Sequence, residues 1–223
     1  MDILIIIVLL IITLGSYIYI EIIYRKYKKI KLKNLKSGFE ISREIIDNYE
    51  LNNIYITESK NVLFSYYDYD RKVIRLANGV FNDTSLVSCA IAATCASYAV
   101  YDKQKDKLFS FRKTFEKLAT TILYLGYIVI TIGILFGNIM TILTGVALEY
   151  AVLLFYLFTY KLEKSIKIRA LHELKNNKLI TKNEIKKIEE LLKANSYIYI
   201  ASIVFPISRL FKLIIDFGKS DRN

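Results

Sequence analysis

Long apolar runs alternate with basic, polar stretches along this chain. Residues 3–24 are apolar almost throughout, and two further apolar runs, 118–137 and 139–160, are separated only by Asn138 and its neighbours. Each run is long enough to cross about 30 Å of hydrocarbon as a helix. The pattern predicts an N-terminal transmembrane helix at 1–24 and a tight transmembrane hairpin at 118–160.

Basic residues flank each of these runs at one end. They follow the first run at 25–36, precede the hairpin at 112–117 and follow it at 161–169. Because basic flanks remain in the cytoplasm, the pattern predicts a multi-pass protein of the bacterial cell membrane, with its N-terminus outside and its main polar regions cytoplasmic. The last segment, 196–223, is apolar but contains Pro206, Arg209 and Lys212, so crossing the membrane and lying at its surface both stay open.

The polar region 25–117 has its own pattern. Apolar residues recur at helical spacing in 37–49, which predicts a short amphipathic helix. Three brief runs rich in aliphatic and aromatic residues follow at 53–57, 61–67 and 72–77, with turn residues between the last two. We expect these runs to form a small antiparallel β-unit.

Residues 84–103 predict a buried helix made of small side chains. The polar cluster at 82–85 can cap its first amide groups. Cys89 and Cys95 are about 600° apart around such a helix, so they point to different faces and we expect two reduced, buried thiols.

Two further features lie in the second half of the hairpin and in the segment that follows it. Glu149 falls inside the third apolar run, where an ionisable residue indicates function, although a protonated or packed carboxyl fits equally well. Residues 161–195 predict cytoplasmic helices, the second of which begins with a capping box at Thr181 and Glu184.

Composition supports the membrane interpretation and limits the alternatives. The chain is 54% hydrophobic and carries a formal net charge of +11. The excess of lysine accompanies abundant Ile, Tyr and Asn, and no nucleic-acid-binding motif accompanies the charge. We therefore expect membrane lipid, and not nucleic acid, as a partner.

The order of these parts resembles the YugP-type membrane zinc metallopeptidases of bacteria. Tyr67-Asp68 with the strand at 72–76 is similar to that family's His-Tyr-Asp-Pro turn and the strand after it. Leu162-Glu163 with Arg169-Ala170-Leu171 is similar to its Val-Glu-Phe-Asp-Ala-Ser-Arg-Arg-Ala-Leu run. The resemblance implies a mainly helical multi-pass membrane protein with a small antiparallel β-unit and a cytoplasmic zincin-like helical domain.

The chain departs from the family at the helix 84–103. Where the family has a His-Glu-x-x-His motif, the resemblance places Ala92, Ala93 and Ala96, and it places the third zinc ligand at Glu163. A catalytic zinc needs three protein ligands, and the motif's glutamate activates the metal-bound water. The only histidine, His172, lies on a charged helix, and Cys95 is a lone thiol in an apolar helix.

From this departure we expect a protein that is not an enzyme and has lost its zinc. Its predicted role is to bind or regulate a membrane protein or peptidase partner through a cleft near Tyr66, Asp68 and Cys95. A multi-pass scaffold without a cleft and an active metallopeptidase with substituted ligands are the alternatives. A small pore-forming protein fits less well, because it needs neither an ordered β-unit nor capped cytoplasmic helices.

Overall fold

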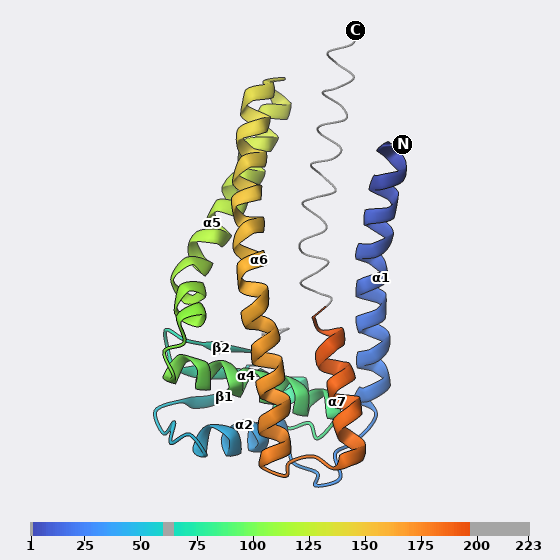
Figure 1. The fold of residues 1–223 in the computed structure, drawn as a ribbon, viewed down its shortest axis with the longest axis vertical. Coiled ribbons are helices and arrows are strands. Elements are labelled where there is room, and N and C mark those ends of the chain that lie inside the picture. Colours follow the sequence, from blue (N-terminus) through green and yellow to red (C-terminus); the bar gives the residue numbers. More distant parts are fainter. Residues whose placement is uncertain (1, 60–64, 197–223) are drawn as a thin grey trace. The chain divides into compact units, whose positions relative to one another are not determined.

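The computed structural model describes residues 2–59 and 65–196. The chain forms two compact units. Among the described residues, one unit contains 2–19 and 111–161, and the other contains 20–110 and 162–196. Three long helices belong partly to each unit, namely α1 (Asp2–Lys28), α5 (Lys107–Leu135) and α6 (Ile139–Asn176). The remaining elements belong to the unit formed by residues 20–110 and 162–196 (Figure 1).

The predicted amphipathic helix is α2, Gly38–Asp47. Ser37 caps its N-terminus, and Glu40 accepts the backbone N–H of Ser37 in return. Ile41, Ile45 and Ile46 are fully buried, which is the face that the helical spacing predicted.

The predicted β-unit exists, but its pairing is mixed and not antiparallel. Strand β3 (Val73–Ala77) lies between β1 (Tyr55–Ser59) and β2 (Tyr66–Asp68). β2 pairs with β3 antiparallel, whereas β1 pairs with β3 parallel. The expectation was wrong for one of the two pairs: β1 lies along the edge of β3 opposite β2 and runs in the same direction as β3.

Helix α4, Leu86–Lys103, confirms the predicted buried helix. It follows the short helix α3, Asn78–Phe81, and its N-cap is Ser85, whose hydroxyl accepts the backbone N–H of Ser88. Asp83 accepts hydrogen bonds from the hydroxyls of Ser85 and Ser88 and from Lys31. Burial raises the pKa of Asp83, but these hydrogen bonds outweigh that effect, and its pKa falls to about 2.

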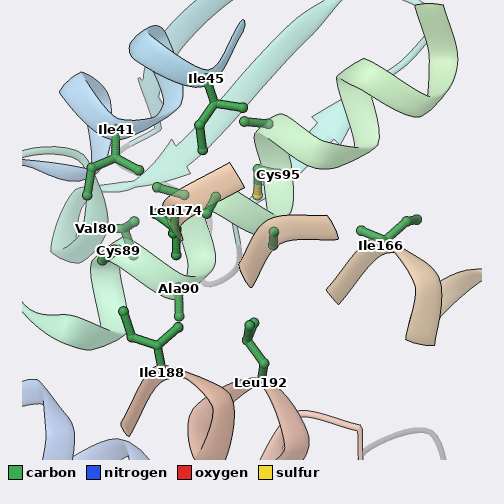
Figure 2. Packing of buried hydrophobic residues seen from close by; sticks show 14 of the residues in the cluster. Ile41, Ile45, Val80, Cys89, Ala90, Cys95, Ile166, Leu174, Ile188 and Leu192 are labelled. Carbon is green, nitrogen blue, oxygen red and sulfur yellow. The ribbon is translucent and has the colours of Figure 1, made fainter. Parts of the chain in front are cut away.

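The core of this unit is built around α4. Ile41 and Ile45 of α2 and Leu174 of α6 belong to the same cluster of buried residues as Cys89 and Cys95 of α4 (Figure 2). Ile188 and Leu192 of helix α7 (Lys182–Ala194) point toward Ala90 of α4 in the same view. The small side chains of α4 permit this close packing on several sides.

Helix α7 begins as predicted, because Glu184 accepts both the backbone N–H and the hydroxyl of Thr181. The polar helix expected after residue 160 is the second half of α6, which continues without a break from Ile139 to Asn176. Both cysteines are buried and reduced, as predicted.

In the other unit, α5 and α6 form a helical hairpin. A Cβ on Gly145 of α6 would lie 2.9 Å from the carbonyl oxygen of Gly126 of α5, so glycine allows the two backbones to approach closely. Among the described residues, α5 and α6 are long and apolar enough to cross a membrane. Residues 3–24 lie within α1. The expectation for the segment 197–223 lies outside the described residues.

Candidate functional site

Glu163 lies where α6 meets α4. Its side chain is 3% exposed, and it accepts a hydrogen bond from the hydroxyl of Tyr98 on α4. The ring of Tyr98 also contacts the ring of Phe109, with centroids 6.3 Å apart. The position that the resemblance assigns to a third ligand therefore faces Tyr98.

Ala92 and Ala96 lie on a different side of α4. Tyr98 follows Ala96 by about 200° and Ala92 by about 240° around the helix axis. Ala92, Ala93 and Ala96 are all fully buried, and the backbone carbonyl of Ala92 accepts a hydrogen bond from Ser42 of α2. The structure therefore places this face of α4 in the core, and it does not bring the three alanines together with Glu163.

The side of α4 that carries Tyr98 is partly open. Ile91, Thr94 and Tyr98 are half-buried, whereas the opposite side is closed. Thr94 precedes Tyr98 by four residues, about 40° of net rotation, so the two hydroxyl-bearing residues share a face. A small apolar notch opens beside Thr94, and its walls come from α1, α4 and α7: Tyr24, Val87, Ala90, Ile91, Thr94, Leu191, Leu192 and Asn195. We call this side, defined by Ile91, Thr94 and Tyr98, the open face of α4.

The predicted cleft residues Tyr66 and Asp68 are not part of this face. Both belong to β2, and Tyr67 between them is buried and donates a hydrogen bond to Asp102 of α4. Because neighbouring side chains alternate along a strand, Tyr66 and Asp68 point away from α4. Asp68 instead accepts the backbone N–H of Arg71 in the following turn.

Neither Cys95 nor His172 is prepared to act as a metal ligand here. Cys95 is 4% exposed, and burial raises the pKa of its thiol to about 12, so the thiol stays protonated. His172 has a side chain that is 64% exposed, and it lies next to Asn176 on α6. Most of the His172 side chain is therefore in contact with solvent.

Glu149 is buried within the hairpin. It is 5% exposed, and a Cβ on Gly126 would lie 3.3 Å from its Cγ, so the absence of a side chain at Gly126 leaves room for the carboxyl group. The structure places Glu149 in the unit formed by the hairpin, whereas Glu163 belongs to the other unit.

Thr94 and Tyr98 were not among the site residues predicted from the sequence. A signal was present, because the two residues have the same i, i+4 spacing as the histidines of the His-Glu-x-x-His motif. The contact that identifies Tyr98 joins it to Glu163, 65 residues away, and only the structure reveals it.

Comparison with known proteins gives two matches. A family model described as "Putative neutral zinc metallopeptidase" covers residues 2–218. A protein of Bacillus subtilis (strain 168), named "Putative membrane protease YugP", is 24% identical over 201 residues, which are 87% of this chain and 86% of the relative. No solved structure matches the chain.

These matches correct two expectations. The sequence led us to expect no enzyme and no zinc, because the motif positions carry alanines. The family description names a zinc metallopeptidase and the relative is named a protease, so the family indicates an enzyme with zinc as its cofactor. Both expectations were wrong because they inferred the loss of a function from the loss of one motif, whereas the family description names that function.

The donor atoms at the open face of α4 do not fit the usual catalytic zinc site. Glu163 supplies a carboxylate, and its neighbour Tyr98 supplies a hydroxyl that donates to it. Catalytic zinc sites use three protein ligands drawn mainly from His, Cys and carboxylates. Within residues 2–59 and 65–196, no three or more His, Cys, Asp or Glu side chains form a group that could hold a metal ion.

The resemblance in the order of parts is confirmed along nearly the whole chain. The family match begins in α1, includes the β-unit, α4 and the hairpin, and extends beyond α7. With residues 2–218 matched, the chain belongs to the family described as "Putative neutral zinc metallopeptidase".

Proposed function

We propose that this chain is a multi-pass membrane protein that acts on polypeptides near the membrane surface, and that the polypeptide binds to the open face of α4. The substrate class follows from the relative's name, membrane protease. The observation that carries the proposal is the hydrogen bond between Tyr98 and Glu163, which places a buried carboxylate beside a half-buried stripe of α4.

The open face has the chemistry that a polypeptide requires. The hydroxyl groups of the half-buried residues Thr94 and Tyr98 can accept a backbone N–H, and such a neutral hydrogen bond is worth about 0.5–1.5 kcal/mol. The notch beside Thr94 is apolar apart from the polar groups of Tyr24, Thr94 and Asn195, and it has room only for a group about the size of one water molecule. These groups can therefore hold an extended chain mainly by its backbone.

The membrane placement rests on the helices and on their flanks. α5 and α6 have the length and composition of membrane spans, and α1 ends in Arg25, Lys26 and Lys28. Basic flanks favour the cytoplasmic side, so we place the N-terminus outside and the open face of α4 in the cytoplasm. Lipid then surrounds the exposed apolar side chains of the hairpin, such as Leu135, Phe136 and Met140.

Polypeptide affinity tests this proposal. The full chain is reconstituted in lipid nanodiscs, and binding of fluorescent casein, an unstructured polypeptide, is measured for the wild type, E163Q and Y98F. We expect both variants to bind about tenfold more weakly, because E163Q removes the charge that accepts the Tyr98 hydroxyl and Y98F removes that hydroxyl. Glu189, an α7 residue whose carboxylate pairs with Lys193, provides the matched control E189Q.

The outcome separates a binding face from a structural contact. Equal affinity of all four proteins for casein would contradict the proposal, as would loss of affinity in E189Q equal to that in E163Q. Casein cleavage is recorded in the same samples with zinc supplied. Cleavage that is unchanged in E163Q and Y98F would place the working site elsewhere in the chain and would also overturn the proposal.

A further inference from the structure

Arg169 of α6 lies at a junction of three helices. Its guanidinium carbon is 5.0 Å from the ring centroid of Tyr101 on α4 and 5.7 Å from that of Tyr49, just beyond the end of α2. Its Nη1 donates a hydrogen bond of 2.5 Å to the side-chain oxygen of Gln104, the C-cap of α4. The side chain is 23% exposed, so much of it is enclosed by these partners.

A buried carboxylate completes the junction. Glu173 of α6 is 4% exposed, and its Oε1 lies 3.6 Å from the Nε of Arg169. The same oxygen accepts a 2.6 Å hydrogen bond from the hydroxyl of Tyr49. The backbone carbonyl of Tyr49 in turn accepts a hydrogen bond from Lys103 of α4. Each of the three helices is therefore connected to the other two through these groups.

The junction and the open face involve the same two helices. On α4, Tyr101 follows Tyr98 by one turn, and on α6, Arg169 follows Glu163 by about 9 Å along the axis. The contacts of Tyr98 with Glu163 and of Tyr101 with Arg169 thus join α4 to α6 at two successive points. Two points of attachment fix both the rotation and the axial position of α6 against α4, which one contact alone cannot do.

From this geometry we infer that Arg169 is a positioning residue, whose contacts with Tyr101 and Gln104 hold Glu163 against Tyr98. The inference rests on the proposed function, because it concerns the same pair of residues. Arginine suits this role because its guanidinium stacks on aromatic rings and donates along fixed directions, whereas a lysine ammonium is a point charge.

A double-mutant cycle tests the inference without any substrate. Unfolding of the full chain in detergent is measured for the wild type, Y98F, E163Q and the double variant, and the four are measured again in an R169K background. In the Arg169 protein we expect Tyr98 and Glu163 to be coupled by about tenfold in the unfolding equilibrium constant. In the R169K background we expect the coupling to fall below about twofold.

Matched variants separate positioning from general stability. Y101F keeps the ring under Arg169 and should preserve the coupling, whereas Y101L removes the ring and should reduce it even if R169K fails to fold. R112K changes an arginine that pairs with Glu116 in the other unit, and it should leave the coupling unchanged.

The coupling energies test the positioning role of Arg169 separately from the pairing of Tyr98 with Glu163. Equal coupling in the Arg169 and R169K backgrounds, or in Y101F and Y101L, would overturn the positioning role and leave the proposed function intact. Absence of coupling in the wild type would overturn the pairing of Tyr98 with Glu163, on which the proposed function and the inference both rest. The two failures are therefore distinguishable.

Discussion

The two sides of α4 differ in what surrounds them. The side with Ala92 and Ala96 is fully buried and packs in the core with α2, whereas the side with Thr94 and Tyr98 is half-buried and reaches a carboxylate. Small apolar side chains serve the first side, because they let backbones approach. A hydroxyl group serves the second, because that of Tyr98 donates a hydrogen bond to Glu163. The difference indicates that chemistry in this helix belongs to the open face, and that the alanines are core.

The buried state of the whole helix is tested by thiol alkylation, where the largest effect is expected. Burial raises the pKa of Cys95 to about 12, so its thiolate fraction near neutral pH is about a thousandfold below that of an ordinary thiol. We expect iodoacetamide to modify Cys95 and Cys89 slowly in the folded chain and rapidly after denaturation. Fast modification of Cys95 in the folded chain, followed by mass spectrometry, would show that α4 is accessible on that side.

The closed side is tested by overpacking. A96L introduces three carbons at a position that is fully buried, so we expect a loss of about 1–3 kcal/mol in the free energy of unfolding. Circular dichroism during denaturation measures the change. If A96L were as stable as the wild type, a space would exist beside Ala96, and the closed side would be a candidate cleft after all.

The cap of α4 is tested by pH. In D83N the acceptor for Lys31, Ser85 and Ser88 loses its charge, so we expect a loss of about 1–2 kcal/mol at neutral pH. The folded pKa of Asp83, about 2, is below its ordinary value of 3.8, so its contribution is complete above pH 4 and is lost as the pH falls toward 2.

Comparison of the two proteins checks the assignment. The stability difference between the wild type and D83N should shrink as the pH falls from 4 to 2. A difference that stays constant over this range would mean that the charge of Asp83 does not stabilise the start of α4.

The open side is tested by a substitution of Thr94, for which we expect the smallest change in the free energy of unfolding. The hydroxyl of Thr94 donates to the carbonyl of Ala90 in the preceding turn, a local bond that helices make readily. We expect T94V to change the free energy of unfolding by less than about 0.5 kcal/mol, as for other substitutions outside the core. A loss as large as that of A96L would show that the two sides of α4 are equally packed.

Much of the fold was predictable because it depends on local patterns. The boundaries of α2 and α4 follow from apolar spacing and from the capping residues Ser37 and Ser85. The parallel pairing of β1 with β3 was not predictable, since alternation along a strand identifies its buried side and not the direction of its neighbour. Pairing partners are chosen by tertiary contacts that sequence spacing does not contain.

The site was harder to predict for a related reason. Glu163 was identified from the resemblance, but its partner Tyr98 lies 65 residues away in the chain. The resemblance alone assigned the motif to Ala92 and Ala96, and helix geometry shows that these positions and Tyr98 are on different sides. The missing motif had led us to expect neither enzyme activity nor zinc. The family match corrects this expectation, because the family is described as a zinc metallopeptidase.

Site-specific photo-crosslinking tests the central claim most directly. A photoreactive amino acid is placed at Thr94 on the open face or, as the control, at Ile168, an α6 residue that is 60% exposed. The full chain in nanodiscs is irradiated with fluorescent casein. The account predicts a casein crosslink at position 94 that E163Q reduces, and little crosslinking at 168. Equal crosslinking at both positions, or a crosslink at 94 that E163Q leaves unchanged, would contradict it.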